Sequence, residues 1–316
     1  MKRGIDLTAW VCVEDDEPIP KKPLVVSVSS VCVPTPSHHH GFHPDLLSPH
    51  SEDTDACDPY PCEDAQLSAA DYYSTFIDRT KEQCEAESQA PQRSKEWKEA
   101  RKFALTGSDF GSAAGLNPFC SPEELAKKKL WDTFKGNQAT KWGSCMEDSA
   151  AEAFEEWART TLDPQCKLHH FGLLKFKETP WLAVSPDGIL EWTNNGTLQY
   201  DLVEFKCPTR TETEAHPYSK YCADTPPYYK AQMLGIWGYC NSHGFQYPLT
   251  DAWFVVWQPK TVWITRHSFT VQEWNDLFDK LKLWFFSKWL PALVWKYEGR
   301  LDEGHIQPTT KPLCLA

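Results

Sequence analysis

The chain has 316 residues, of which 41% are hydrophobic, so it can build one large domain or two small ones around a substantial core. It has no run of about 18 apolar residues, and its N-terminus turns acidic before an apolar signal region develops. These features argue against a membrane span and against secretion. We therefore expect an intracellular protein, in the nucleus or the cytoplasm, whose 12 Cys are free thiols.

The net charge of −12 argues at first against a protein that handles nucleic acid. The acidic residues are unevenly distributed, however, since residues 1–90 hold 6 Lys/Arg against 17 Asp/Glu and the other 226 residues hold 26 against 27. The first part therefore has a net charge of −11 and the rest a net charge of −1. Because phosphate contacts depend on local charge, a nearly neutral body can still present a basic groove. Composition does not exclude a nucleic-acid substrate.

Pattern and composition divide the chain into three parts. Residues 1–66 contain 9 of the 24 Pro and lack a sustained hydrophobic period, so we expect a mostly disordered, acidic tail. Residues 67–300 show helical and strand periodicity and are expected to form one domain. A short C-terminal tail at residues 301–316 is expected to follow it.

Helices dominate the first half of the predicted domain. The sequence predicts helices at residues 94–103, from Thr106 or Ser108 to about Gly115, from Ser121 onward, and at residues 141–160. The third has a strong start signal, because Ser121 can cap it, Pro122 suits its first position and Glu124 can return a capping bond. In the fourth, apolar residues from Trp142 to Trp157 recur at helical spacing.

Strands dominate the second half. The predicted elements are strands at 168–176, 182–190 and 199–207, a helix at 227–242, strands at 252–258 and 262–269, and a final helix at 271–289. Asn194 to Gly196 is a turn signal between the second and third strands, and Pro259-Lys260 lies between the last two. This order predicts an α/β fold with a mixed central β-sheet flanked by helices.

Three residues in the strand region form a candidate site. Asp187 lies in a Ser-Pro-Asp-Gly sequence that, taken alone, predicts only a β-turn. Glu204 and Lys206 project to one face of their strand, because strand side chains alternate. If the two strands pair through the turn at 194–196, Asp187 comes near Glu204. Two carboxylates beside a lysine can hold Mg²⁺, and the lysine can hold or deprotonate an attacking water.

Four motifs in order carry a family resemblance. They are WKEAR with LTGS (97–108), WGSCME (142–147), SPDG with EFK (185–206) and YKAQ (229–232). The third resembles the site of the PD-(D/E)xK nucleases. Together the four are similar to the lambda-exonuclease/YqaJ viral recombinase group of that superfamily, although Gly107 stands where that group more often has Ala. The resemblance implies a restriction-endonuclease-like fold.

The resemblance implies a metal centre and a water-handling lysine. The metal centre is expected to hold two ions of Mg²⁺ or Mn²⁺. Its ligands would be Asp187, Glu204, Glu147 and the backbone carbonyl of Phe205. Lys206 would position or activate the attacking water. Glu147 also has a plainer interpretation as a surface residue of an amphipathic helix.

The resemblance also implies roles for four further residues. Gln232 would support the lysine or the water, Arg101 and Ser108 would bind the 5′-phosphate of a DNA end, and Tyr229 would line the site. Other interpretations stay open for three of them. Arg101 fits a solvated helix face, Ser108 fits a helix cap and Tyr229 fits a core aromatic residue.

The activity that the resemblance implies is hydrolysis of double-stranded DNA from its ends, as a 5′-to-3′ exonuclease in recombination. A single-strand annealing protein is the implied partner, and a homo-oligomeric ring is a further expectation from the family. Three alternatives remain: an endonuclease or nickase on the same fold, a catalytically weak DNA-end-binding scaffold, and inhibition of the groove by the acidic tail. A fused ATPase is not expected, because the chain has no G-x-x-x-x-G-K-[ST] sequence.

Overall fold

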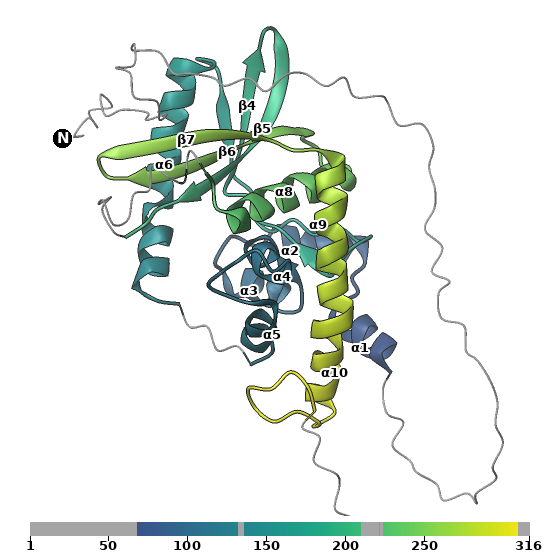
Figure 1. The fold of residues 1–316 in the computed structure, drawn as a ribbon. Helices are drawn as coiled ribbons and strands as arrows, with labels where there is room; N and C mark the ends of the chain where they lie inside the picture. Colours follow the sequence, from purple (N-terminus) through teal and green to yellow (C-terminus); the bar gives the residue numbers. More distant parts are fainter. Residues whose placement is uncertain (1–67, 132–135, 210–220, 222–223, 309–316) are drawn as a thin grey trace, which may run out of the picture.

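The structure is a computed structural model that describes residues 68–131, 136–209, 221 and 224–308 (Figure 1). The tail predicted for residues 1–66 lies outside the described residues, and the predicted C-terminal tail is described only to residue 308. Among the described residues, no helix is long and apolar enough to cross a membrane.

The described elements follow the predicted order, with helices first and a sheet second. The N-terminal group comprises α1 (Ala69–Phe76), α2 (Lys81–Ser88), α3 (Lys95–Arg101), β1 (Leu105–Thr106), the 3₁₀ turn η1 (Gly107–Asp109), α4 (Phe110–Ala113), α5 (Pro122–Trp131) and α6 (Gln138–Thr161). The remainder comprises β2 (Lys167–His169), β3 (Leu182–Ala183), β4 (Gly188–Asn194), β5 (Thr197–Lys206), α8 (Pro227–Ser242), β6 (Leu249–Gln258), β7 (Thr261–Ser268), α9 (Val271–Trp284), the π-helical turn η2 (Phe285–Trp289) and α10 (Leu290–Tyr297).

A five-stranded sheet with the order β2-β4-β5-β6-β7 forms the centre of the fold. The β5–β6 pair is parallel, whereas β2–β4, β4–β5 and β6–β7 are antiparallel. The sheet is therefore mixed, and the predicted α/β class with a mixed central sheet flanked by helices is confirmed.

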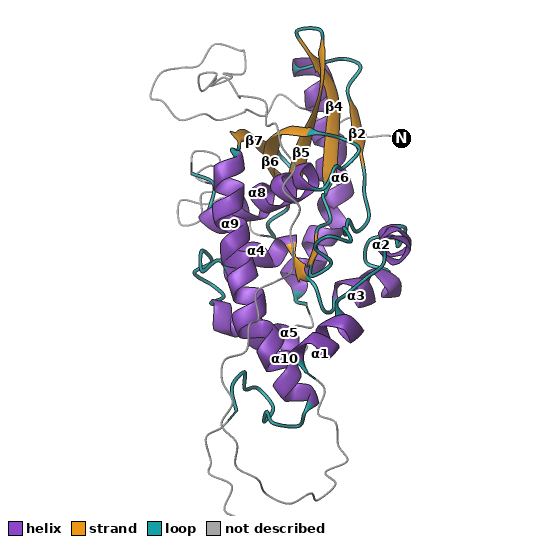
Figure 2. Cartoon of the chain, turned by 90° about the vertical axis from the view of Figure 1, so that its right-hand side faces the viewer, coloured by secondary structure: helices purple, strands orange, loops and turns teal. Residues whose placement is uncertain are grey.

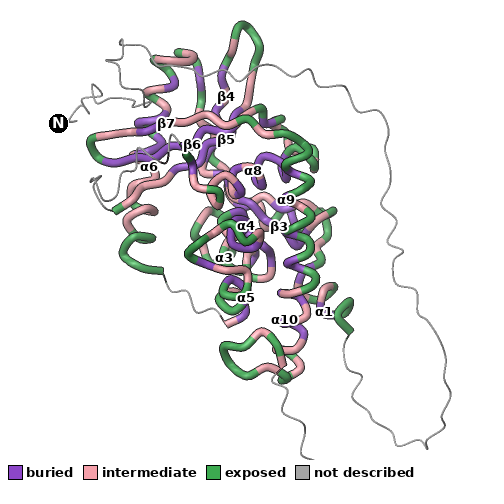
Figure 3. Tube along the Cα trace, viewed as in Figure 1, coloured by how far each residue is buried: buried purple, intermediate pink, exposed green. Residues whose placement is uncertain are grey.

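Helices cover both faces of this sheet (Figures 1 and 2). On one face, Phe154 and the alanines of α6 pack against a cluster that includes Val203 and Phe205 of β5. On the other, α8 and α9 pack against a larger cluster that includes Leu202 and Phe254. The most continuously buried strand segments are accordingly most of β4 and β6 and the second half of β5, and α8 is largely buried as well (Figure 3). Because alternate residues of β5 serve the two faces, the strand end can hold polar side chains between two packed layers.

The α8 helix lies very close to its neighbours at glycines. A Cβ added at Gly235 would lie 2.1 Å from the Phe110 ring of α4, and one at Gly238 would lie 2.2 Å from the Trp274 ring of α9. Both distances are shorter than non-bonded atoms tolerate, so only glycine, which has no side chain, fits at these positions. The aromatic rings thereby fix α8 against the helical layer, and α8 also carries Tyr229 and Gln232.

The β4–β5 hairpin forms as predicted around a two-residue turn. Asn194 pairs with Thr197, so Asn195 and Gly196 are the turn residues, with φ of 49° and 81°. Positive φ at both positions is the geometry that favours Asn-Gly in tight hairpins. The register then fixes every later pair of the two strands, down to Gly188 opposite Val203.

Two predicted strands are wrong in their extent. The predicted strand 182–190 is broken at Ser185 to Asp187 into β3 and β4, and β3 pairs in parallel with β1 in a separate two-stranded sheet. Pro186 has no N–H for a ladder bond, which explains the break. The predicted strand 168–176 reduces to β2 and a single bridge between Leu174 and Val184.

The helix predictions differ from the structure mainly at the two ends of the domain. The helices α1 and α2 were not predicted. Each begins with a capping box, at Ser68 and Thr80, but buries only one residue, so neither has a periodic apolar stripe. The final helix begins at Val271 as predicted but continues through η2 and α10 to Tyr297. The π-helical turn precedes Pro291, where an uninterrupted α-helix would lose a backbone bond.

Candidate active site

The hairpin register places Asp187 opposite Glu204. Gly188 is the first residue of β4, and it pairs with Val203 of β5. One position further from the hairpin turn, Asp187 therefore lies opposite Glu204. Asp187 Oδ2 accepts a hydrogen bond from the backbone N–H of Phe205 at 2.9 Å. Because the N–H and C=O of one strand residue point to the same edge, the Phe205 carbonyl faces the Asp187 side as well.

Glu204 is buried between the layers and only partly satisfied. Its side chain is 1% exposed, and its Oε1 accepts hydrogen bonds from Gln232 Nε2 at 2.6 Å and from Lys206 Nζ. Its Oε2 has no hydrogen-bond partner among the described residues. An unpaired buried carboxylate oxygen is costly, so this atom is suited to a bound cation.

Lys206 contacts Glu204, Gln232 and the ring of Tyr229. Its Nζ binds Glu204 Oε1, lies 3.4 Å from Gln232 Oε1 and lies 4.8 Å from the centre of the Tyr229 ring. Burial lowers the pKa of Lys206, but the charges of Glu204 and Asp187 outweigh it and raise the pKa above the ordinary lysine value. A raised pKa favours a Lys206 that holds a water or an anionic oxygen over one that removes a proton.

Three carboxylates share the site and oppose one another's ionisation. Burial raises the pKa of Glu204 to about 8, and the charge of Asp187 adds to this. Burial and then the charge of Asp187 raise the pKa of Glu147 to about 7. Burial likewise raises the pKa of Asp187, against the opposing charges of Lys206 and Arg93. A cation bound here would relieve this repulsion.

Glu147 enters the site from α6 and is held by a residue that the motifs do not include. Arg93 Nη2 forms an ion pair with Glu147 Oε2, and Arg93 Nη1 donates to the carbonyl of Ser144 at 3.3 Å. The Glu147 side chain is 28% exposed, so it faces the cleft rather than the core.

The donor set is compatible with a divalent cation. Hard oxygen atoms are supplied by Asp187, Glu204 and the Phe205 carbonyl. The Oε2 atom of Glu204 has no hydrogen-bond partner among the described residues, and a bound cation would be a partner for it. Among the described residues, however, no three His, Cys, Asp or Glu side chains are gathered tightly enough to form a metal cluster as they stand. Lys206 and Arg93 instead occupy one oxygen each of Glu204 and Glu147.

Arg101 lines the same cleft and forms no ion pair with a carboxylate of the described residues. Its guanidinium stacks 3.9 Å from the centre of the Trp97 ring, and its Nη1 lies 3.4 Å from Ser185 Oγ, which also accepts from Trp97 Nε1 at 3.2 Å. No ion pair to Arg101 is present in the part of the chain that the structure describes. Burial lowers the pKa of Arg101, although Asp109 and Asp187 oppose this shift. A desolvated, unpaired guanidinium is suited to an anion.

Ser108 is an exposed residue that lines the same cleft as Arg101. Thr106, rather than Ser108, stands at the start of the short helical turn, where its hydroxyl donates to Asp109 Oδ2 at 2.7 Å. The Ser108 hydroxyl lies 3.3 Å from that of Thr106 and also lines the cleft. The helix-cap interpretation of Ser108 is therefore wrong, and its hydroxyl is available to a ligand.

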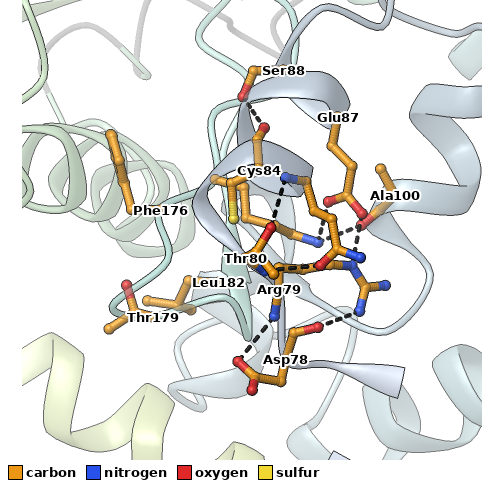
Figure 4. A network of polar contacts seen from close by, with 12 residues as sticks. Asp78, Arg79, Thr80, Cys84, Glu87, Ser88, Ala100, Phe176, Thr179 and Leu182 are labelled. Atoms are coloured by element: carbon orange, nitrogen blue, oxygen red, sulfur yellow. Dashed lines mark hydrogen bonds and ion pairs between the residues drawn. The ribbon is translucent and has the colours of Figure 1, made fainter. Parts of the chain in front are cut away.

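A buried polar network fixes the end of α3 that carries Arg101 (Figure 4). Lys175 Nζ donates to the carbonyl of Ala100 at 2.9 Å and pairs with Glu87 at 2.8 Å. Arg79 Nε donates to the other carboxylate oxygen of Glu87 at 2.8 Å. The Lys175 side chain is only 3% exposed, so it is held in place on both sides. The network ties α2 and the segment before β3 to the residue that precedes Arg101.

All the site residues predicted from the sequence line one cleft with a volume of about 550 Å³. They are Arg101, Ser108, Glu147, Asp187, Glu204, Phe205, Lys206, Tyr229 and Gln232. The same cleft contains Gln92, Arg93 and Ser185, for which the sequence predicted no role in the site. Ser185 could have been found, because it belongs to the Ser-Pro-Asp-Gly motif. Gln92 and Arg93 carry no sequence signal that separates them from an ordinary surface turn.

The comparison with protein families confirms the resemblance seen in the motifs. Residues 96–236 match the family model of the YqaJ-like viral recombinase domain. This segment of the chain is therefore similar to that domain. It includes α3 apart from Lys95, and so includes Arg101, and it ends within α8, after Gln232. No curated protein sequence matches the chain.

Several solved structures are similar to the chain. An alkaline exonuclease, LHK-Exo, from Laribacter hongkongensis is 18% identical, with a TM-score of 0.48, over 65% of this chain and 97% of its own. The Shutoff and Exonuclease Protein from Kaposi's sarcoma-associated herpesvirus is 10% identical, with a TM-score of 0.40, over 74% of this chain and 75% of its own. A SOX–DNA complex is 11% identical, with a TM-score of 0.40, over 71% of this chain and 72% of its own.

Proposed function

We propose that the chain is a metal-dependent deoxyribonuclease that hydrolyses phosphodiester bonds of double-stranded DNA from its ends. The observation that carries the proposal is the convergence of Asp187, Glu204 and Lys206 with an unpaired arginine, Arg101, in one cleft. The match of residues 96–236 to the viral recombinase family supports the same activity.

Asp187, Glu204 and the Phe205 carbonyl would hold Mg²⁺ or Mn²⁺, with Glu147 as a further ligand when two ions are bound. The cation would supply charge stabilisation at the scissile phosphate and lower the pKa of an attacking water. Gln232 holds Glu204 Oε1 and approaches Lys206 Nζ, and so it fixes both groups relative to each other. The protonated Lys206 would orient the water or stabilise a developing negative oxygen, which favours the positioning role over the base role.

Arg101, Ser108 and the Ser185 hydroxyl would bind the phosphate at the 5′ end of the DNA. A planar guanidinium can donate two parallel hydrogen bonds to phosphate oxygens. The Trp97 ring and Ser185 hold that plane in place before the ligand arrives. Because Ser185 also belongs to the turn that presents Asp187, the end-binding and metal-binding groups have a fixed spacing. This arrangement favours a 5′-to-3′ exonuclease.

The wider organisation of the protein is part of the proposal. We infer a nuclease domain at residues 67–300 with an acidic tail before it and a short tail after it. In recombination, a 5′-to-3′ exonuclease would leave single-stranded 3′ tails, so a single-strand annealing protein is the expected partner. A ring-shaped homo-oligomer would add processivity by enclosing the product strand.

The test compares linear, nicked circular and covalently closed circular duplex DNA, each incubated with Mg²⁺ or with EDTA. We expect digestion of linear duplex with Mg²⁺, no digestion with EDTA and survival of the closed circle. Cleavage of the closed circle would assign an endonuclease, and nicking alone would assign a nickase. Binding of linear duplex with no turnover in Mg²⁺ or Mn²⁺ would contradict the proposed activity and assign an end-binding scaffold.

A further inference from the structure

A turn at Gln92 and Arg93 reaches both halves of the candidate metal site. Gln92 Nε2 donates to the carbonyl of Phe171 at 2.7 Å and lies 3.4 Å from the carbonyl of Pro186, the residue before Asp187. Arg93 Nη1 donates to the carbonyl of Ser144, and its Nη2 pairs with Glu147. Two adjacent side chains therefore contact the segment that presents Asp187 and the helix that presents Glu147.

The backbone at Arg93 is in a conformation that its own residue type disfavours. Its φ is 70°, whereas long side chains rarely occupy the left-handed region and pay about 1–3 kcal/mol to do so. Its side chain is 46% exposed, so burial offsets little of this. Glycine or asparagine would suit the turn better if only the backbone mattered. The contact that requires an arginine is the one to Ser144 and Glu147.

We infer that the Gln92–Arg93 turn is a brace that positions Glu147 relative to Asp187 for metal binding, with Arg93 as the positioning residue. The inference rests on the proposed function. The turn precedes the matched family segment, which begins at residue 96. The ion pair of Arg93 is made to the Oε2 atom of Glu147, so the brace sets the direction of this carboxylate. Groups that orient metal ligands in this way commonly change metal affinity or activity by about 10–100-fold.

A matched control lies on the same helix. Arg159 pairs with Glu155 of α6, with exposed fractions of 50% and 25%, compared with 46% and 28% for Arg93 and Glu147. The two pairs therefore have the same chemistry and nearly the same exposure. Arg159 and Glu155 do not line the cleft. Exposed ion pairs of this kind contribute little to stability, so removing either should leave the fold intact.

The experiment is calorimetric titration of the full-length, metal-free chain with Mg²⁺ alone, without DNA. We expect R93Q to bind Mg²⁺ about 10–100-fold more weakly than the unmodified protein, and R159Q to bind it equally well. R93K should recover part of the affinity, because lysine keeps the charge but not the two-pronged geometry. R93G should lose affinity while its Tm stays unchanged or rises, since glycine accepts a φ of 70°.

Three results would overturn the brace. R93Q could bind Mg²⁺ as tightly as the unmodified protein, or R93Q and R159Q could lose affinity equally. A lower Tm in R93Q and R93G with unchanged Mg²⁺ affinity would assign Arg93 a purely structural role. If the unmodified protein itself binds no Mg²⁺, both the brace and the proposed metal-dependent activity are contradicted. Failure of the brace alone is distinguishable, because the unmodified protein then binds Mg²⁺ and R93Q binds it equally well.

Discussion

Short-range geometry of the β4–β5 hairpin holds Asp187, Glu204 and Lys206 together at its open end. Asp187 and Glu204 could be paired because the Asn195-Gly196 turn fixes the hairpin register, and strand alternation placed Lys206 on the face of Glu204. The state of Lys206 could not be predicted, because its charge depends on burial and on two carboxylates that the fold brings together. Arg93 could not be predicted either, since its contact with Glu147 spans 54 residues and comes from a turn with no pattern.

The role of Arg101 in binding a DNA end makes a prediction at the residue scale. We expect R101A to lower kcat/KM by about 10–100-fold on duplexes with a 5′-phosphate, because a charge-assisted hydrogen-bond pair of about 1.5–3 kcal/mol is lost. Duplexes with a 5′-hydroxyl should be digested almost as before. The measurement is initial rates on the two end chemistries. K98A, at an exposed lysine of the same helix, is the control, and an R101A enzyme that still prefers the 5′-phosphate would refute the assignment.

His267 predicts a pH dependence of stability that does not involve the active site. Burial, with a smaller contribution from Lys230, lowers the pKa of His267 to about 4, and its Nε2 lies 2.9 Å from the Thr225 hydroxyl. A histidine with a lowered pKa stabilises the fold above its unfolded pKa of about 6.5, and this stability is lost as pH falls toward 4. Between pH 7 and pH 4.5 we expect the unmodified protein to lose about 2–3 kcal/mol more than H267Q. Parallel urea-unfolding curves for the two proteins would contradict this.

At the scale of elements, the sequence predicted helices and hairpins better than strand ends. The helix at 227–242 has the predicted bounds because Pro226 and Pro227 mark its start. The strand at 182–190 was predicted as continuous because its residues are β-prone, although Pro186 cannot join a ladder. The separate β1–β3 pairing could not be predicted, since it joins residues 105–106 to 182–183. Such pairing depends on the packing of the helical layer.

Close packing of α8 gives the element-scale prediction. G238A should lower the free energy of unfolding by about 1–3 kcal/mol, because the new Cβ would lie 2.2 Å from the buried ring of Trp274. The control is G143A in α6, where the nearest atom to the new Cβ lies 3.9 Å away and alanine should stabilise the helix by up to about 1 kcal/mol. Chemical denaturation measures both. Equal stabilities for G238A and the unmodified protein would show that the helices separate more easily than the structure implies.

For the whole molecule, the distribution of charge leads to a prediction about the acidic tail. Residues 1–66 hold 4 Lys/Arg and 12 Asp/Glu, a net charge of −8, so their carboxylates could compete with DNA phosphate for Arg101. If this tail competes with DNA, its deletion should raise kcat/KM several-fold at about 30 mM salt and very little at 300 mM, where exposed charges are screened. If the deletion changes kcat/KM equally at both salt concentrations, or not at all, the tail does not compete with DNA through its charge.

The central claim is that the hairpin end formed by Asp187, Glu204 and Lys206 is the hydrolytic centre of a DNA-end nuclease. The most direct test is single-turnover digestion of 5′-phosphorylated linear duplex in Mg²⁺ by the unmodified protein, D187N and K206M, with duplex binding measured in parallel. We expect both variants to lose at least about 10³-fold in rate, consistent with the loss of electrostatic stabilisation at the reacting phosphate, while their affinity for duplex changes little. Variants that bind duplex normally and digest it at the rate of the unmodified protein would contradict the account.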